Sequence, residues 1–247
     1  MDLKKEIQSI IKASPVKMKD MLESVYNYNS RFLLDEEQEK LMEKTIFSMT
    51  QIDRKLFADN EERAYDDLAL PIGHHQTISQ PSTVARMIIT AELQPGDDVL
   101  EIGTGSGWNA CLMQFLVYPG NVTSIERIAK LKEKAEANII QLKGFLNQKK
   151  QEHYQKIKKL AFHAENIFEK GSARKRKYNK IIFTAGISTK KQEEKIEELA
   201  DELLKKEGIL VCPRVSGKMI ILKKEKELKK FETKEEYLFV PLIQTRD

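Results

Sequence analysis

A cluster of three glycines directly after a short apolar run is the feature that most restricts how this chain can fold. Residues 99–102 are Val-Leu-Glu-Ile, and residues 103–107 are Gly-Thr-Gly-Ser-Gly. Glycine adopts positive φ without a steric penalty and lets a ligand come close to the backbone. Because residues 107–117 suit a helix, we predict a strand, a tight turn and a helix, as at the ligand-binding edge of parallel α/β sheets.

The rest of the chain alternates between strand-like and helix-like segments. Further strands are expected at residues 121–126, 160–163, 180–184, 209–212, 218–222 and 237–242, and further helices at 81–93, 128–149 and 190–206. Strands that alternate with helices, and then follow one another without helices at the end, indicate the α/β class. We predict a mainly parallel sheet with helices on both faces and antiparallel C-terminal strands.

The N-terminal part is predicted to be helical. Leu3, Ile7, Ile10 and Ile11 recur at helical spacing, and their apolar stripe needs a surface to pack on. We therefore divide the chain into an N-terminal helical extension, 1–69, docked on a main domain, 70–247. Residues 70–81 mix Pro, Gly and small polar residues without periodicity, which predicts a loop.

Charge and cysteine content exclude several classes of protein. The net charge is +4, from 42 Lys and Arg against 38 Asp and Glu, so the chain does not resemble a polyanion-coating protein. No apolar run approaches the roughly 18 residues that cross a bilayer. Two cysteines without a Cys/His cluster predict no bound metal and no disulfide framework. The N-terminus lacks a signal-peptide core, so the expected location is the cytoplasm.

An acid at the end of the second predicted strand suits a nucleoside ligand. Glu126 lies about 20 residues beyond the glycines, the spacing at which a carboxylate reaches two ribose hydroxyls. The loop has neither the Gly-x-Gly-x-x-Gly spacing of pyrophosphate sites nor a Walker lysine. A cofactor without phosphates, S-adenosyl-L-methionine, fits better than NAD or ATP, with Glu101 a candidate partner of its α-ammonium group. The motif alone leaves open a tight turn with an incidental surface carboxylate.

Four segments in a fixed order resemble one enzyme family. Residues 63–67 are Arg-Ala-Tyr-Asp-Asp, residues 73–87 contain Thr-Ile-Ser-Gln-Pro, and residues 99–110 and 122–128 hold the glycine loop and Glu126. Together they resemble the protein-L-isoaspartate (D-aspartate) O-methyltransferase family, more loosely also over 177–187, 205–213 and 239–243. The resemblance implies the Rossmann-like fold of S-adenosylmethionine-dependent methyltransferases.

The family's reaction is methyl transfer from S-adenosyl-L-methionine to the free α-carboxylate of L-isoaspartyl residues in damaged proteins, a repair activity. Such a carboxylate is already ionised at neutral pH, so alignment matters more than a base. Motif position implies Ser79 as the catalytic residue, although it could also cap the helix that begins at Pro81. The implied cofactor-binding residues are Gln76, Thr77, Ile78, Ser79, Glu101, Gly103, Thr104, Gly105, Ser106, Gly107, Glu126 and Glu165. The implied substrate-binding residues are Thr77, Ile78, Ser79, Thr184 and Ala185.

The sequence departs from the family pattern in two places. Family members often have a small residue at the position of His75. The family's Gly-Asp-Gly signature, whose acid lies near adenine, is replaced by residues 163–166, where Glu165 either substitutes for that acid or belongs to a plain turn.

Two alternative functions use the same cofactor loop. A tRNA or rRNA methyltransferase would use the basic run 174–177, but few aromatic residues lie nearby for base stacking, so nucleic acid is not an expected partner. A non-catalytic module would bind the cofactor without turnover. The expected partners are isoaspartyl-containing peptides and proteins. No association with a membrane is expected, and the oligomeric state is left open.

Overall fold

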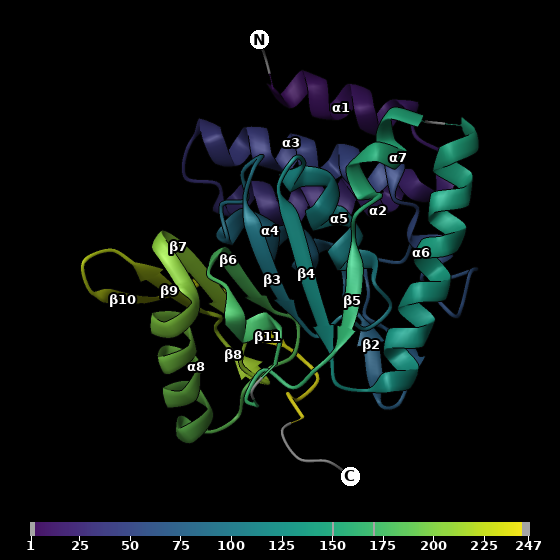
Figure 1. Ribbon diagram of the computed structural model, residues 1–247. Coiled ribbons are helices and arrows are strands. Elements are labelled where there is room, and N and C mark those ends of the chain that lie inside the picture. The colour runs from purple at the N-terminus through teal and green to yellow at the C-terminus, as the bar shows by residue number, and fades with distance from the viewer. Residues whose placement is uncertain (1–2, 150, 170, 244–247) are drawn as a thin grey trace.

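The computed structural model describes residues 3–149, 151–169 and 171–243, so Met1 and Asp2 of the predicted extension lie outside the described residues. Within these ranges the chain forms a seven-stranded sheet in the order β10-β9-β7-β6-β3-β4-β5 (Figure 1). Strands β7, β6, β3, β4 and β5 run parallel, while β9 and β10 are antiparallel. The bounds are β3 (Asp98–Ile102), β4 (Asn121–Glu126), β5 (Ala161–Ala164), β6 (Tyr178–Phe183), β7 (Leu204–Cys212), β9 (Ile220–Lys224) and β10 (Leu228–Glu232).

Helices cover both faces of the sheet, so the predicted fold class is confirmed. Side chains alternate along β3: Val99 packs in the apolar cluster on one face, and Leu100 in the cluster on the other. The first cluster is shared with α4 (Pro81–Thr90), α5 (Trp108–Val117), α6 (Ala129–Lys149) and α7 (Gln151–Ile157). The second is shared with α8 (Lys190–Leu203).

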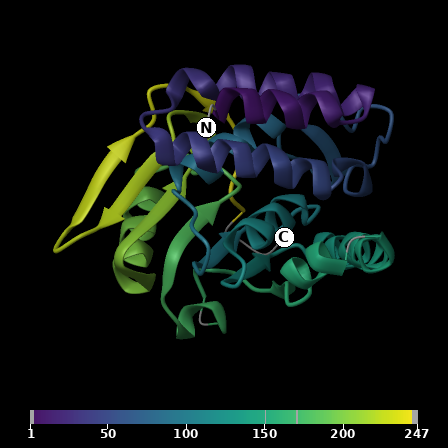
Figure 2. The same ribbon diagram turned by 90° about the horizontal axis from the view of Figure 1, so that it is seen from above.

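Three N-terminal helices form an outer layer on the first face. These are α1 (Leu3–Ala13), α2 (Val16–Asn29) and α3 (Glu36–Gln51), drawn in purple and blue in Figure 2. Ile7, Leu22 and Ile46 are buried in the same apolar cluster as α4 and α5. The helices therefore pack on the sheet's helical cover, as their apolar stripes predict.

The prediction of a loop over residues 70–81 is wrong. Strands β1 (Leu70–Gly73) and β2 (Gln76–Ile78) pair antiparallel, and helix α4 begins at Pro81. His74 and His75 form the two-residue turn between the strands with φ of 52° and 54°. Such a turn usually carries Asn or Gly, and strands this short leave no detectable alternation.

Two C-terminal predictions also need correction. Helix α8 ends at Leu203, and residues 204–208 belong to β7, where the pairing with β6 is irregular between Tyr178 and Lys180. The predicted strand 237–242 is a strand only at β11 (Tyr237–Leu238), which pairs with β8 (Ser216–Gly217), and Pro241 bridges to Gly186 instead. The chain after β11 therefore turns toward the carboxyl end of β6.

Connections from β3 lead to one side of the sheet and those from β6 to the other, so the strand order reverses between them. Open α/β sheets bind ligands outside the carboxyl ends of the strands at such a point. In the described ranges no helix is long and apolar enough to cross a membrane.

Candidate active site

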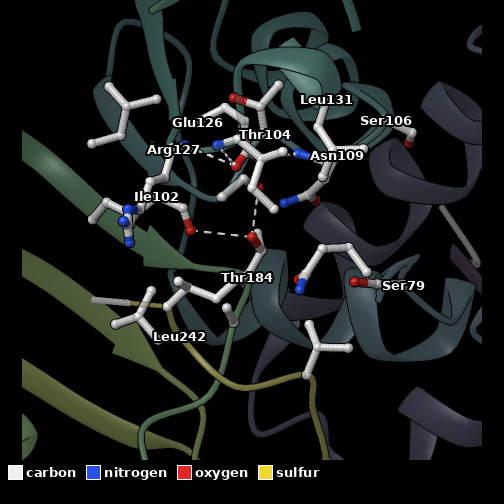
Figure 3. Close-up of a pocket in the computed structure, with 18 of the residues that line it drawn as sticks. Ser79, Ile102, Thr104, Ser106, Asn109, Glu126, Arg127, Leu131, Thr184 and Leu242 are labelled. Carbon is white, nitrogen blue, oxygen red and sulfur yellow. Dashed lines mark hydrogen bonds between the residues drawn. The ribbon is translucent and has the colours of Figure 1, made fainter. Parts of the chain in front are cut away.

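A pocket opens at the carboxyl ends of the parallel strands, where the strand order reverses (Figure 3). Its wall combines the segments that follow β3, β4, β5 and β6 with β2, Ser79 and the C-terminal segment 240–243. The structure therefore brings most of the sequence-predicted residues to one hollow. They are Gln76, Thr77, Ile78, Ser79, Gly103, Thr104, Gly105, Ser106, Glu126, Glu165, Thr184 and Ala185.

The glycine loop fits tightly against its neighbours. Gly103 has φ of 103°, and a Cβ there would lie 2.3 Å from Thr184 Oγ1. Gly107, with φ of 88°, is the N-cap residue immediately before α5, and a Cβ there would lie 3.1 Å from the Phe162 ring. Both positions thus need glycine for two reasons, the backbone conformation and the lack of space. Gly107 does not line the pocket, unlike the four preceding loop residues.

Glu126 fixes the opposite wall at the end of β4. Its Oε2 accepts from the Gly105 amide at 2.9 Å, and its Oε1 accepts from the amides of Arg127 at 2.8 Å and Ile128 at 2.9 Å. An ionised carboxylate offers about four acceptor positions, so capacity for a ligand hydroxyl remains. The side chain thus joins the two strand ends that flank the pocket.

The structure does not place Glu101 on the pocket wall. Its side chain is fully buried beneath the loop, where Ser124 Oγ and Asn109 Nδ2 donate to its carboxylate, the latter at 2.9 Å. Burial raises the pKa of Glu101 to about 8, against the lowering effect of these hydrogen bonds. On β3, Glu101 shares the side of Val99 and so points beneath α5, which begins with Trp108 and Asn109.

Asn109 is a pocket residue that sequence reasoning missed. Its Nδ2 donates to Glu101, whereas its Oδ1 is buried and has no hydrogen-bond partner among the described residues. Buried acceptors of this kind normally have a partner. Asn109 is the second residue of α5 and lines the pocket just beyond the glycine loop (Figure 3), and its place at the start of the expected helix was the one available signal.

Ser79 lies on the far side of the hollow from Arg127 (Figure 3). The structure leaves its hydroxyl without a hydrogen-bond partner among the described residues. It is not the helix cap: the N-cap of α4 is Gln80, and Asp67 accepts from the Ser82 amide at 2.8 Å in the first turn. Thr184, by contrast, uses its hydroxyl to donate to the Gly103 carbonyl at 2.5 Å.

Glu165 follows β5 and borders the pocket beside Glu126. Its backbone amide donates to the Glu126 carbonyl at 3.1 Å, while its own carboxylate accepts from Ser172 Oγ and from the Ala173 amide. The carboxylate is thus directed to the turn at residues 171–173. Other wall residues absent from the sequence prediction include Val84, Ile102, Trp108, Arg127, Leu131, Phe168 and the segment 240–243.

Comparison with protein families shows to which family this chain belongs. The family model described as protein-L-isoaspartate(D-aspartate) O-methyltransferase matches residues 28–247. The chain belongs to this family. Family membership confirms the resemblance seen in the motifs, and α1 and most of α2 precede the matched region.

Curated isoaspartate methyltransferases align with much of the chain. The enzyme of Ignicoccus hospitalis is 38% identical over 173 residues, 67% of this chain and 71% of its own length. The enzyme of Pelodictyon phaeoclathratiforme is 33% identical over 211 residues, 81% of this chain and 84% of its own. Other relatives match over a shorter core, as in Fervidobacterium nodosum, at 50% identity over 99 residues and 50% of that enzyme's length.

Solved structures share the fold of this isoaspartate methyltransferase family member. A Plasmodium falciparum protein assigned to the same enzymes and solved with S-adenosyl-L-homocysteine superposes with a TM-score of 0.70, at 20% identity, over 92% of this chain and 99% of its own. A second protein-L-isoaspartate O-methyltransferase gives a TM-score of 0.66 at 23% identity over 89% of this chain and 65% of its own. At these identities the likeness establishes the fold.

Proposed function

We propose that this protein transfers a methyl group from S-adenosyl-L-methionine to the free α-carboxylate of L-isoaspartyl residues in damaged proteins. The observation that carries the proposal is the meeting of two family motifs at one pocket. Ser79 and its neighbours border the same hollow as the glycine loop and Glu126. Family membership supports the same reaction.

The residues at the pocket fit the cofactor. The backbone of the glycine loop lines the pocket, Glu126 keeps free acceptor capacity for ribose hydroxyls, and Asn109 Oδ1 lacks a partner among the described residues. We assign Glu126 to the ribose and Asn109 Oδ1 to the α-ammonium group, the donor that the sequence analysis gave to Glu101. We propose that the remaining cofactor contacts come from Gln76, Thr77, Ile78, Gly103, Thr104, Gly105, Ser106 and Glu165. Gly107 contributes through the conformation of the loop and not through contact with the cofactor.

When bound, the cofactor supplies an electrophilic methyl on a positively charged sulfur. Attack of the isoaspartyl carboxylate on that methyl carbon would form the new carbon–oxygen bond and leave the electron pair of the broken carbon–sulfur bond on sulfur, so no proton would have to move. The protein therefore aligns and partly desolvates the carboxylate. We propose that the Ser79 hydroxyl donates to this carboxylate, and that Thr77, Ile78, Thr184 and Ala185 hold the peptide around it.

The function is tested by methyl-transfer assays on three substrates: an isoaspartyl peptide, its normal aspartyl twin and bulk tRNA. The proposal expects methylation of the isoaspartyl peptide alone. Methylation of the two peptides at equal rates, or of tRNA in preference to them, would contradict the substrate assignment.

The location and the division of the chain are proposed on separate grounds. Both cysteines, Cys111 and Cys212, are buried free thiols, which supports a reducing compartment such as the cytoplasm. Residues 1–69 are proposed as an extension of the domain 70–247, supported by the apolar cluster that both share.

A further inference from the structure

Arg54 is a charged residue that neither the motifs nor the proposed chemistry uses. It follows α3 in the short turn Arg54–Leu56 and its side chain is fully buried. Burial lowers its pKa to about 10, although Asp67 and Asp66 act in the opposite direction. A buried guanidinium is costly unless its donors are matched, so its partners indicate what it holds.

Those partners are four backbone carbonyls from two chain segments. The guanidinium donates to the oxygens of Ala64 at 2.6 Å, Asp66 at 3.2 Å and Leu68 at 2.9 Å. It also donates to the Ser79 oxygen at 3.2 Å. These segments lie immediately before and after the β1–β2 hairpin, so one side chain closes the base of the loop that carries the proposed catalytic residue.

The same short segment also contacts the cofactor side of the pocket. The Arg54 guanidinium carbon lies 5.4 Å from the ring centroid of Trp108, the first residue of α5. Trp108 Nε1 donates to the Ile52 carbonyl at 2.9 Å. Residues 52–54 therefore connect Ser79, on the substrate side, with the helix that follows the glycine loop.

The planar guanidinium group of arginine suits a site with four carbonyl acceptors on two chain segments. Arginine presents its donors in a fixed plane, whereas lysine carries its three donors on a single flexible ammonium group. A lysine at position 54 would keep the charge but cannot match four carbonyls in two directions. The Ser79 carbonyl, which contacts the guanidinium group from the other side of the hairpin, would then lose its donor or pull the loop out of place.

We propose that Arg54 is a positioning residue that holds Ser79 at the distance from the cofactor that methyl transfer requires. The proposal rests on the proposed function, because it assigns Ser79 to the reaction. It predicts an effect on catalysis that is separable from cofactor binding.

The test compares Arg54→Lys and Arg54→Ala with Arg63→Lys, a control in the same region whose half-exposed side chain pairs with Asp66. Affinity for S-adenosyl-L-homocysteine is measured by calorimetry, and kcat and KM with an isoaspartyl peptide. Arg54→Lys should bind the cofactor product within about threefold of the wild type and lose about ten- to a hundredfold in kcat, as a misaligned reacting group does. Millimolar guanidinium should restore part of the kcat of Arg54→Ala.

Three results would overturn the proposal. They are wild-type kcat and KM in Arg54→Lys, a fall in product affinity as large as the fall in kcat, and failure of both variants to fold. If the wild type itself does not methylate the peptide, the proposed function fails. Amide hydrogen exchange then tests the role of Arg54 independently of activity. If Arg54 holds this segment, Arg54→Lys should exchange faster over residues 76–82 while its affinity for S-adenosyl-L-homocysteine stays unchanged.

Discussion

The Gly105 amide donates to Glu126 Oε2 across 2.9 Å, so the loop that follows β3 is hydrogen-bonded to the end of β4 without any ligand. The other carboxylate oxygen holds the two amides that follow β4. The carboxylate therefore holds the backbone of two loops and is also proposed to bind the ribose. Its removal should affect both the loop structure and cofactor binding.

Glu126→Ala should weaken binding of S-adenosyl-L-homocysteine by one to two orders of magnitude, because charge-assisted hydrogen bonds contribute about 1.5–3 kcal/mol. Titration calorimetry measures the change. Glu133→Ala removes an exposed carboxylate from α6 and should leave the affinity unchanged. Equal affinities in the two variants would remove Glu126 from the site.

Gly103→Ala should destabilise the protein and abolish cofactor binding. The new Cβ would lie 2.3 Å from Thr184 Oγ1, and φ of 103° disfavours any side chain. The backbone conformation alone costs about 1–3 kcal/mol. Gly144→Ala is the matched control, because Gly144 lies within α6 with nothing within 4 Å of its Cβ position, and should stabilise by about 0.5–1 kcal/mol. Urea denaturation measures both, and equal midpoints would contradict the prediction.

Ser79→Ala should reduce turnover and leave cofactor affinity intact. A single neutral hydrogen bond contributes about 0.5–1.5 kcal/mol and misalignment adds to it, so kcat should fall roughly ten- to a thousandfold. Single-turnover assays with an isoaspartyl peptide, next to calorimetry with S-adenosyl-L-homocysteine, separate the two effects. Full activity in this variant would leave the Ser79 hydroxyl without a role.

Glu101 should make the stability of the wild type depend on pH. Its folded-state pKa is raised from 4.5 to about 8 by burial, so between these values the folded state binds a proton that the unfolded state has lost. Stability therefore falls as pH rises from about 4.5 to about 8, and this loss is complete above that range. Glu101→Gln should remove this part of the slope in a Tm series from pH 5 to 9. Parallel curves for the two proteins would show that the carboxyl titrates normally.

Leu22→Ala should destabilise the whole domain, although it lies before the region matched by the family model. Leu22 is fully buried in the main apolar cluster, and such truncations cost about 2–5 kcal/mol. Val16→Ala, on the same helix at a position 76% exposed, should change little. Two unfolding transitions, with only one moved by Leu22→Ala, would instead show an independently folding extension.

The parts of the site that could be predicted are those encoded by residue type at fixed spacing. The three glycines between a strand and a helix, and the acid at the next strand end, indicate from sequence where they lie, at the carboxyl ends of neighbouring strands. The sequence predicts Glu101 at the pocket, whereas the structure buries its side chain under α5, because consecutive residues of a strand point to opposite faces and the sequence does not fix which face Glu101 takes.

Arg54 and Asn109 mark what the sequence could not reveal. The acceptors of Arg54 are backbone carbonyls, which every residue has, so no side-chain pattern announces them. Asn109 becomes noticeable only when its Oδ1 is found buried without a partner in the described structure. The β1–β2 hairpin was missed because its turn carries histidines where turn chemistry favours Asn-Gly.

The histidine turn has a practical consequence. His74 and His75 each hold a left-handed conformation that costs an ordinary residue roughly 1–2 kcal/mol, so this hairpin is kept closed by the burial of Ile72 and Ile78 and by Arg54 at its base, and not by its own tip. The excised hairpin would have little tendency to fold as a peptide. In the intact protein, an Asn-Gly tip offers thermal robustness at two exposed positions outside the pocket wall, without redesign of the residues that face the reactants.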